Sequence, residues 1–518
     1  MVCRNQWPCE TCLSTESQEK RSLSQTGGSV VEKTITFSPF TRVEGDLKIE
    51  LQVGNGRVSK ALTCGTLYRG FEDILRGRSP LDAIVITCRI CGQCGASHSA
   101  AASAALGKVF GTVPPPNGVL CANIIQAVEM VLNHLTHFYL SFAVDIAGPP
   151  YDVSLTNRFA SIKGISFRST ISARSRLLAL LGIFAGKWPN TLAIQPGGVT
   201  KPISAAELAK ADSILAEFIR FLEEQVFGCN LADWLSLKSL SDVEAWLSDN
   251  KHANSDIGVF IHTSLKHGFL NLGRGPGRFL SGGELSSHNG GAPFFNSGYY
   301  DGSLHLLNET QITEHITYSW YESDSNEIPS LQKSRVYVKP SKEVAYSWCK
   351  APRYAGKSAE VGPIARMVIN GDHLALDLVK IAGSNVFSRV LTRLHEMVKL
   401  TVQIREWLYS IEPDKPFYVR EEVSDGSAFA FVPAPRGMLG HWVDIENGRI
   451  NHYEIITPTC WNFSPRDSSG QPGPAEEALV GTEVDEGTHY KSIAHIVRSF
   501  DPCLFCSVHL LDHTIKLL

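Results

Sequence analysis

The sequence predicts an α+β protein that is predominantly helical, with a core bundle of long helices, peripheral α+β segments and antiparallel hairpins. Three observations support this fold class. Asn55-Gly56 and Asn447-Gly448 each separate two strand-like runs, which is a strong hairpin signal near either end of the chain. Between the hairpins, apolar residues recur mostly with the period of a helix. The segment 251–360 is rich in Gly, Asn, Ser and Tyr, which is typical of irregular α+β structure.

The expected elements follow in chain order. Residues 1–32 are rich in Ser, Gln, Glu and Gly and predict a flexible tail. Its Cys9-x-x-Cys12 pair has no partner nearby and is interpreted as incidental. The main body of the protein is expected over 33–509, and a short C-terminal extension over 510–518. Two strands are expected around Asn55-Gly56, from Leu47 onward.

Helices are expected through the middle of the body. Small residues over 96–106 predict the first of them. Apolar residues recur at helical spacing over 125–142 and again over 208–226. Ser204 and Glu207 form the pattern of a capping box, so the last of these helices is expected to begin there.

Composition is that of an ordinary globular protein, with 43% hydrophobic residues, 19% charged residues and a net charge of −4. Nothing indicates a nucleic-acid-binding surface or a polybasic membrane patch. No run of about 18 apolar residues is apparent, so no transmembrane segment is expected. The first residues lack the apolar region of a secretory signal. We therefore expect a cytoplasmic protein, with any membrane association made through partners.

The 13 cysteines include C-x-x-C pairs that lie far apart, which favours metal or redox chemistry over a disulfide scaffold. One group contains Cys88, Cys91, Cys94 and then His98; the other contains Cys503, Cys506 and then His509. Spacing alone leaves three options open. These are a zinc site, an iron–sulfur cluster, and one site of four thiolates that joins both groups around a soft metal such as nickel or iron.

Further motifs surround the two cysteine groups. The full set is Arg42-Val-Glu44-Gly, Tyr68-Arg-Gly-Phe-Glu72, Arg89-x-Cys91-Gly-x-Cys94-x-x-x-His98, Ala434-Pro-Arg436-Gly and Asp501-Pro-Cys503-x-x-Cys506-x-x-His509. With these motifs in this order, the sequence resembles the large, catalytic subunit of the [NiFe] hydrogenases from about Thr34 to His509. The resemblance implies that family's fold and a nickel–iron centre whose iron carries carbon monoxide and two cyanide ligands.

The resemblance implies a role for each matching residue. Cys91 and Cys503 would be terminal thiolates on nickel, and Cys94 and Cys506 would bridge nickel and iron. His98 would donate a hydrogen bond to a bridging sulfur.

Polar residues around the metals would act on the bound groups. Arg436, after Pro435, would lie over the open site and pair with Asp501. Thr459 would offer its hydroxyl to a cyanide. Glu44 would be the first proton relay. Without the resemblance, Glu44 would be interpreted as a salt-bridge partner of Arg42.

The resemblance also implies a second, hard metal ion. Glu72, His509 and the backbone carbonyl of Ile455 would hold magnesium or a similar divalent ion. Its expected role is to tie the C-terminal segment to the core.

The sequence departs from the family pattern at several places. Asn133 stands where many relatives have aspartate, and Pro433 where many have glutamate. Cys88 and Cys460 are extra thiols that we interpret as packing residues. The stretches 186–198 and 457–473, with Asp46 after Gly45, resemble group 2 members, which include cytoplasmic uptake enzymes and hydrogen sensors.

The resemblance, together with residues 510–518 after His509, implies an uptake hydrogenase that oxidises H2, because hydrogen-sensing members typically end at that histidine. Electrons would pass to an iron–sulfur small subunit in an obligate heterodimer or a higher oligomer. A maturation chaperone and a C-terminal endopeptidase that removes 510–518 are further expected partners. The alternatives are a hydrogen sensor with the same site and slow turnover, and a structural subunit that binds zinc or a cluster without catalysis.

Overall fold

The computed structural model describes residues 15–23, 29–323, 327–328, 336–484, 487 and 490–507. It describes side chains over 33–323, 336–484, 487 and 490–505. Cys9, Cys12, His509 and the predicted extension 510–518 therefore lie outside the described residues. Cys506 is described for its backbone alone.

An antiparallel sheet in the order β1-β2-β3-β4 forms the N-terminal part of the molecule. Its strands are β1 (Thr15–Leu23), β2 (Ser29–Phe37), β3 (Leu47–Gly54) and β4 (Arg57–Gly65). The predicted Asn-Gly hairpin joins β3 to β4, with positive φ at Asn55 (52°) and Gly56 (73°), as a type I′ turn requires. Residues 15–32 thus include strand β1 and the start of β2, where the sequence predicted a flexible tail.

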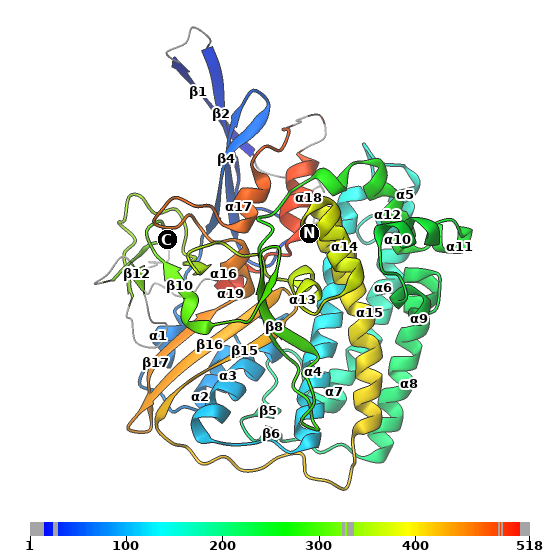
Figure 1. Cartoon of the computed structure of the whole chain (residues 1–518), viewed down its shortest axis with the longest axis vertical. Coiled ribbons are helices and arrows are strands. Elements are labelled where there is room, and N and C mark those ends of the chain that lie inside the picture. The colour runs from blue at the N-terminus through cyan, green and yellow to red at the C-terminus, as the bar shows by residue number, and fades with distance from the viewer. Residues whose placement is uncertain are drawn as a thin grey trace, which may run out of the picture.

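Helices follow the sheet and build the body of the molecule (Figure 1). The first group is α1 (Phe71–Leu75), α2 (Asp82–Thr87), α3 (Gly95–Phe110), α4 (Pro116–Thr136), α5 (Ser154–Phe159), α6 (Ile165–Leu177) and α7 (Ala179–Ala185). A short hairpin of β5 (Ile194–Gln195) and β6 (Gly198–Val199) comes next. The second group is α8 (Ala205–Phe221), α9 (Leu231–Leu235), α10 (Leu240–Trp246), α11 (Asn250–Ala253) and α12 (Asp256–Lys266).

Local signals place several of these helices as predicted. α8 begins with the capping box of Ser204 and Glu207. The predicted helix over 125–142 is α4, which continues as a π-helix, η1 (His137–Phe142), and then as a 3₁₀ turn, η2 (Ala143–Ile146). A second π-helix, η3 (Leu222–Phe227), ends α8. Small residues let most of α3 be buried against β15, β16 and α4.

One described helix, Pro116–Ile146, is long and apolar enough to cross a membrane, although no such segment was expected from the sequence. Within its apolar window, 89% of the residues are buried inside the protein. It packs against α15 (Val386–Ser410), beside α7 and α3 (Figure 1). Its apolar character therefore serves the core here.

The predicted irregular α+β segment is confirmed over the residues that the structure describes. It contains short sheets in the orders β7-β8-β9, β12-β10-β14 and β11-β13. Its elements are η4 (Phe269–Asn271), β7 (Phe279–Glu284), β8 (Phe295–Tyr300), β9 (Leu304–His305), η5 (Glu309–Gln311), β10 (Ile312–His315), β11 (Tyr321–Glu322), β12 (Glu327–Ile328), β13 (Tyr337–Val338) and β14 (Ala351–Tyr354).

The last part of the chain returns to the core. Helices α13 (Pro363–Ile369), α14 (His373–Ala382) and α15 precede a meander of β15 (Gly426–Ala434), β16 (Gly437–Glu446) and β17 (Arg449–Ile456). The second Asn-Gly turn, predicted at Asn447-Gly448, joins β16 to β17. The remaining helices are α16 (Pro458–Asn462), α17 (Pro474–Leu479), α18 (Lys491–Ser499) and α19 (Leu504–Ser507).

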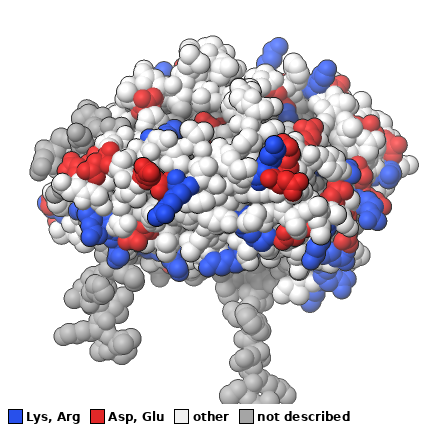
Figure 2. Space-filling view, turned by 90° about the horizontal axis from the view of Figure 1, so that it is seen from below, with Lys and Arg blue, Asp and Glu red and all other residues white. Residues whose placement is uncertain are grey.

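The described fold is the predicted one, with more helix than strand and a large core that includes apolar residues of α3, α4 and α15. Figure 2 views the molecule from below the orientation of Figure 1. On that face, basic and acidic side chains of the described residues are intermixed.

Candidate metal centre

The two cysteine motifs meet in the core. Cys91 and Cys94 lie on the loop between α2 and α3, and Cys503 lies just before α19. The Sγ atoms of Cys91 and Cys503 are 3.5 Å apart, although 412 residues separate them in the chain. All three side chains are buried. The structure thus brings together both cysteine groups, as the third sequence option required.

Gly95 and Glu129 fix the conformation of the loop that carries Cys91 and Cys94. A Cβ at Gly95 would come within 2.8 Å of the Cys88 carbonyl oxygen, so this turn needs glycine. The start of α3 would leave backbone N–H groups without partners, and buried Glu129 of α4 accepts from the N–H of Ala96 and of Ser97, each at 2.9 Å. Burial raises the pKa of Glu129 to about 7, against the hydrogen bonds it accepts. Sequence reasoning missed Glu129.

Glu44 is joined to the second cysteine motif through its backbone. Its N–H donates to the Pro502 carbonyl at 3.3 Å, and its carbonyl accepts from the Leu504 N–H at 2.7 Å. Gly45 has φ +79°, and a Cβ there would lie 2.8 Å from the Phe505 nitrogen. The Glu44 carboxylate accepts from Gln93 Nε2. Burial raises the Glu44 pKa, and the nearby charge of Arg436 opposes that rise.

Arg42 does not serve as the salt-bridge partner that the sequence alone favoured for Glu44. Its guanidinium pairs with buried Asp145 and donates to the Ser141 carbonyl at 3.2 Å. Asp145 also pairs with Arg498.

Arg436 lies in the tight turn between β15 and β16, directly after Pro435. It is buried, and its Nε lies 3.2 Å from Asp501 Oδ1. Its Nη2 donates to Gln93 Oε1 at 3.3 Å. Nη1 is buried and has no hydrogen-bond partner among the described residues. Burial lowers the Arg436 pKa, but Asp501 and the surrounding cysteine sulfurs outweigh burial and raise it well above its usual value.

A network of buried polar and charged side chains contacts the turn between β15 and β16. Arg393 of α15 lies 3.1 Å from Asp501 Oδ2 and donates to the Pro435 carbonyl at 3.3 Å. Its Nη1 is also 3.1 Å from His134 Nδ1, and His134 Nε2 is 3.0 Å from Glu396 Oε1. Burial raises the Asp501 pKa, but Arg436 and Arg393 outweigh burial and lower it. Asp501 is therefore held as a carboxylate.

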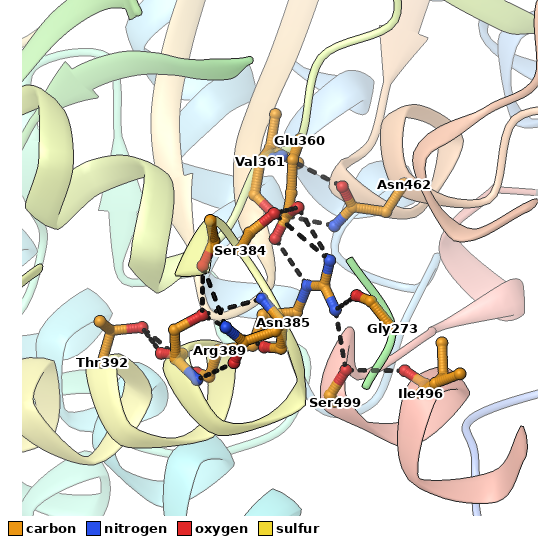
Figure 3. Close-up of polar contacts among 12 residues, drawn as sticks. Gly273, Glu360, Val361, Ser384, Asn385, Arg389, Thr392, Asn462, Ile496 and Ser499 are labelled. Carbon is orange, nitrogen blue, oxygen red and sulfur yellow. Dashed lines mark hydrogen bonds and ion pairs between the residues drawn. The ribbon is translucent and has the colours of Figure 1, made fainter. Parts of the chain in front are cut away.

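A second buried arginine fixes the segment before Asp501 (Figure 3). Arg389 of α15 binds Glu360 Oε1 at 2.8 Å and donates to the Gly273 carbonyl at 2.8 Å (Figure 3). Its guanidinium also lies 3.7 Å from the ring centroid of Phe500. Because Phe500 directly precedes Asp501, this contact positions the start of the second cysteine motif.

The remaining predicted site residues, Thr459, Asn133 and His98, lie near the two cysteine motifs. Thr459 Oγ1 accepts from the Cys503 N–H at 3.0 Å, which leaves its hydroxyl hydrogen free to donate. Asn133 Nδ2 donates to the Gln93 carbonyl at 2.7 Å. Buried His98 contacts His441 with its Nδ1, 3.2 Å from Nε2 of His441. The predicted contact of His98 with a sulfur would therefore fall to its Nε2. Burial lowers the His98 pKa to about 4, so the ring is neutral.

Some of these groups line a common cavity. Its lining residues are Cys94, His98, Ala434, Pro435, Arg436, Leu439, Pro458, Thr459 and Cys503. Buried sulfur atoms and an unpartnered guanidinium nitrogen suit a thiolate-bound metal with polar ligands. The described side chains do not contain a complete site, because no three His, Cys, Asp or Glu among them are arranged to hold a metal ion. The four-cysteine site therefore remains a prediction that needs Cys506.

The expected magnesium ligands lie in a separate buried cluster. Glu72 Oε1 accepts from the Ile455 N–H at 3.1 Å and lies 3.6 Å from Lys350 Nζ. Lys350 also pairs with Glu314 at 3.2 Å and with Glu454. One ammonium group can balance the charge of only one of these three carboxylates, and burial raises the pKa of Glu314 and of Glu454. The third expected ligand, His509, lies outside the described residues.

The two extra thiols have ordinary contacts. Cys88 Sγ donates to the Val85 carbonyl at 3.3 Å. Cys460 Sγ accepts from the Thr457 hydroxyl at 3.3 Å. Both are buried, which agrees with packing roles.

The chain is similar to known proteins over most of its length. The family described as nickel-dependent hydrogenase matches residues 69–150 and 166–509. The large subunit of the periplasmic [NiFeSe] hydrogenase of Desulfomicrobium baculatum is 30% identical, covering 92% of this chain and 95% of that protein. The Hydrogenase-2 large chain of Escherichia coli K12 is 27% identical, covering 93% and 98%.

Solved structures show the same relationship. The Ni-Fe-Se hydrogenase from D. vulgaris Hildenborough in the reduced state superposes with a TM-score of 0.79 at 30% identity, covering 92% of this chain and 100% of the other. A reduced, active Ni-Fe-Se hydrogenase from Desulfomicrobium baculatum gives 0.78 at 28% identity, covering 92% and 100%. The chain therefore belongs to the nickel-dependent hydrogenase family, oxidoreductases in which it is the large, catalytic subunit.

Proposed function

We propose that this chain oxidises H2 as the catalytic subunit of an uptake hydrogenase, with a nickel–iron centre carrying carbon monoxide and two cyanides. The observation that carries the proposal is the meeting of Cys91 and Cys503 beside Arg436, in a member of the nickel-dependent hydrogenases. When bound, the centre supplies the place where H2 is split heterolytically and its two electrons are removed. The proposed holders are Cys91, Cys94, Cys503 and Cys506.

Glu44 is the proposed acceptor of the first proton. Its backbone is hydrogen-bonded to Pro502 and Leu504, so the Glu44 side chain leaves the main chain next to the second cysteine motif. Its burial raises its pKa toward the range in which a carboxylate can accept and release a proton. No metal contact is needed for this role.

Arg436 is the proposed electrostatic partner of the reacting site. Asp501 and Arg393 hold it in place, and its Nη1 remains available to a ligand in the cavity. A buried guanidinium with a free N–H can hydrogen-bond an anionic diatomic ligand. Thr459 would donate to another such ligand, and His98 would donate to a bridging sulfur.

Partners and the second ion follow from the same proposal. The electrons leave through an iron–sulfur small subunit, which makes the enzyme a heterodimer or a multiple of one. Glu72, Ile455 and His509 would hold magnesium near Lys350. A chaperone and an endopeptidase acting after His509 would complete maturation.

A sensor with the same site is the second candidate. The group 2 resemblance of the sequence includes both uptake enzymes and sensors, and the reported relatives do not separate them. The rate of H2 oxidation distinguishes the two candidates, because an uptake enzyme reduces its electron acceptor with H2 rapidly and a sensor does so slowly. A cytoplasmic location likewise remains a proposal, tested by activity in separated cell fractions.

The proposed centre has a direct test. The chain is purified with its small subunit, nickel and iron are measured, and infrared spectra are recorded where metal-bound carbon monoxide and cyanide absorb. We expect nickel and iron together with those bands. A nickel-loaded, mature sample without the bands would overturn the proposal, and the intact mass of the same sample shows whether 510–518 remain.

A further inference from the structure

Gln93 occupies an unusual place in the centre. It lies between Cys91 and Cys94, on the loop that presents both thiols. Its N–H donates to Cys91 Sγ at 3.3 Å, and its carbonyl accepts from Asn133 Nδ2 at 2.7 Å. Both main-chain groups of Gln93 are therefore bound, which fixes the direction in which its half-buried side chain leaves the loop.

The side-chain amide of Gln93 joins two charged groups. Its Nε2 donates to Glu44 Oε1, and its Oε1 accepts from Arg436 Nη2 at 3.3 Å. A primary amide carries a donor and an acceptor in one plane, so it can serve an anion and a cation together. The flipped amide would set N–H against the guanidinium and oxygen against the carboxylate, so these partners select one orientation.

The Gln93 amide is the second of two groups that fix the orientation of the Arg436 guanidinium. Asp501 holds the Nε side of the guanidinium, and Gln93 holds Nη2. The remaining nitrogen, Nη1, belongs to a residue that lines the cavity beside Cys503. The direction of that free N–H therefore depends on both neighbours.

We propose that Gln93 is a positioning residue that holds Glu44 and Arg436 in one fixed arrangement, so that proton transfer and electrostatic stabilisation depend on a single amide. This inference rests on the proposed function, which gives Glu44 and Arg436 their roles. A valine or leucine at position 93 would leave both groups without this partner, and a lysine would repel Arg436.

The test compares variants of the full heterodimer. Gln93→Met keeps the length of the side chain and removes both hydrogen bonds. We expect unchanged nickel and iron, shifted carbon monoxide and cyanide bands, and H2/D2 exchange reduced by about 10- to 100-fold through misplaced groups. Gln126→Met is the matched control, because the Gln126 amide N–H donates to Ala122 of its own helix, α4.

A double-mutant cycle separates positioning from an independent effect. Gln93→Met added to Glu44→Gln should lower exchange by less than the product of the two single losses, because part of the effect of Gln93 on exchange is made through Glu44 and the rest through Arg436. Multiplied losses would overturn the proposal, as would unchanged bands and exchange in Gln93→Met.

A second variant, Gln93→Glu, tests the proposal if Gln93→Met does not assemble the metal centre. Gln93→Glu keeps an acceptor for Arg436 but repels Glu44, so we expect bands near those of the unmodified enzyme and reduced exchange. Loss of nickel from both variants would show that Gln93 only shapes the loop, which would also overturn the proposal. The spectrum of the unmodified enzyme tests the proposed function by itself, so the two failures are distinguishable.

Discussion

Replacing Glu129 by glutamine should loosen the start of α3, the helix that follows Cys94. The Glu129 carboxylate accepts four hydrogen bonds, and each of its oxygens takes two. One oxygen accepts from the N–H and hydroxyl of Ser97, and the other from the N–H of Ala96 and Trp188 Nε1. Glutamine has one oxygen, so its NH2 group must face one pair of donors.

The magnitude follows from the two lost bonds. Hydrogen bonds to a charged group contribute about 1.5–3 kcal/mol each, so the two lost bonds alone would cost about 3–6 kcal/mol. Glutamine also removes the cost of burying a charge, which is larger than what these bonds return because the Glu129 pKa is raised to about 7. The free energy of unfolding should therefore fall by no more than about 3 kcal/mol. With an unfolding entropy of about 2.1 cal/mol/K per residue, a chain of 518 residues loses about 1 °C in Tm per kcal/mol. We expect a Tm lower by no more than about 3 °C, with reduced nickel content because Cys94 is less well placed.

The assay is thermal unfolding at pH 8, where Glu129 is charged because its pKa is about 7. Nickel is measured on the same sample. Glu224→Gln, on the exposed side of η3, is the control for the same chemical change. A Glu129→Gln protein with unchanged Tm and full nickel would refute the reasoning.

Three further variants test other parts of the molecule. Glu44→Gln should keep nickel and iron and reduce H2/D2 exchange by about 10²- to 10⁴-fold; full exchange would remove Glu44 from the mechanism. Burial raises the Glu476 pKa to about 7, so Glu476 contributes stability below its unfolded pKa of about 4.3 and that contribution is lost as pH rises through 7. The Tm of Glu476→Gln should therefore depend less on pH over this window, and an unchanged profile would contradict the assignment. Gly45→Ala should cost about 1–3 kcal/mol through its positive φ and its contact with Phe505, measured as a lower Tm and poorer nickel retention. Gly56→Ala, with positive φ but nothing within 4 Å of a Cβ, isolates the backbone cost; equal losses in the two alanine variants would contradict the steric part.

Short sequence motifs correctly predicted those turns and helix ends whose geometry depends only on neighbouring residues. The Asn-Gly hairpins and the capping box of Ser204 form where expected, because each needs only neighbouring residues. Motif spacing alone left three options open and did not predict that Cys91 and Cys503 meet. Family resemblance supplied that expectation, and the structure supplies the 3.5 Å separation.

Buried charges were the part that sequence reasoning missed. α15 carries Arg389, Arg393 and Glu396 inside the core, where a hydrophobic pattern expects apolar residues. Each is tolerated because its partner comes from a distant segment, as with Arg389 and Glu360. Glu129 is similar, since its partners lie at the start of α3. Such pairs cannot be read from periodicity, because periodicity describes one element at a time.

The link between proton acceptor and metal-binding cysteine is made by the main chain. Glu44 pairs through its N–H and its carbonyl with residues on either side of Cys503. Backbone pairing does not depend on side-chain rotamers, so the separation of Glu44 from Cys503 varies little when side chains move. Gly45 permits this close approach, since any Cβ there would meet the Phe505 nitrogen. The glycine of the Arg-Val-Glu-Gly motif is therefore required by the geometry that brings Glu44 beside the cysteine.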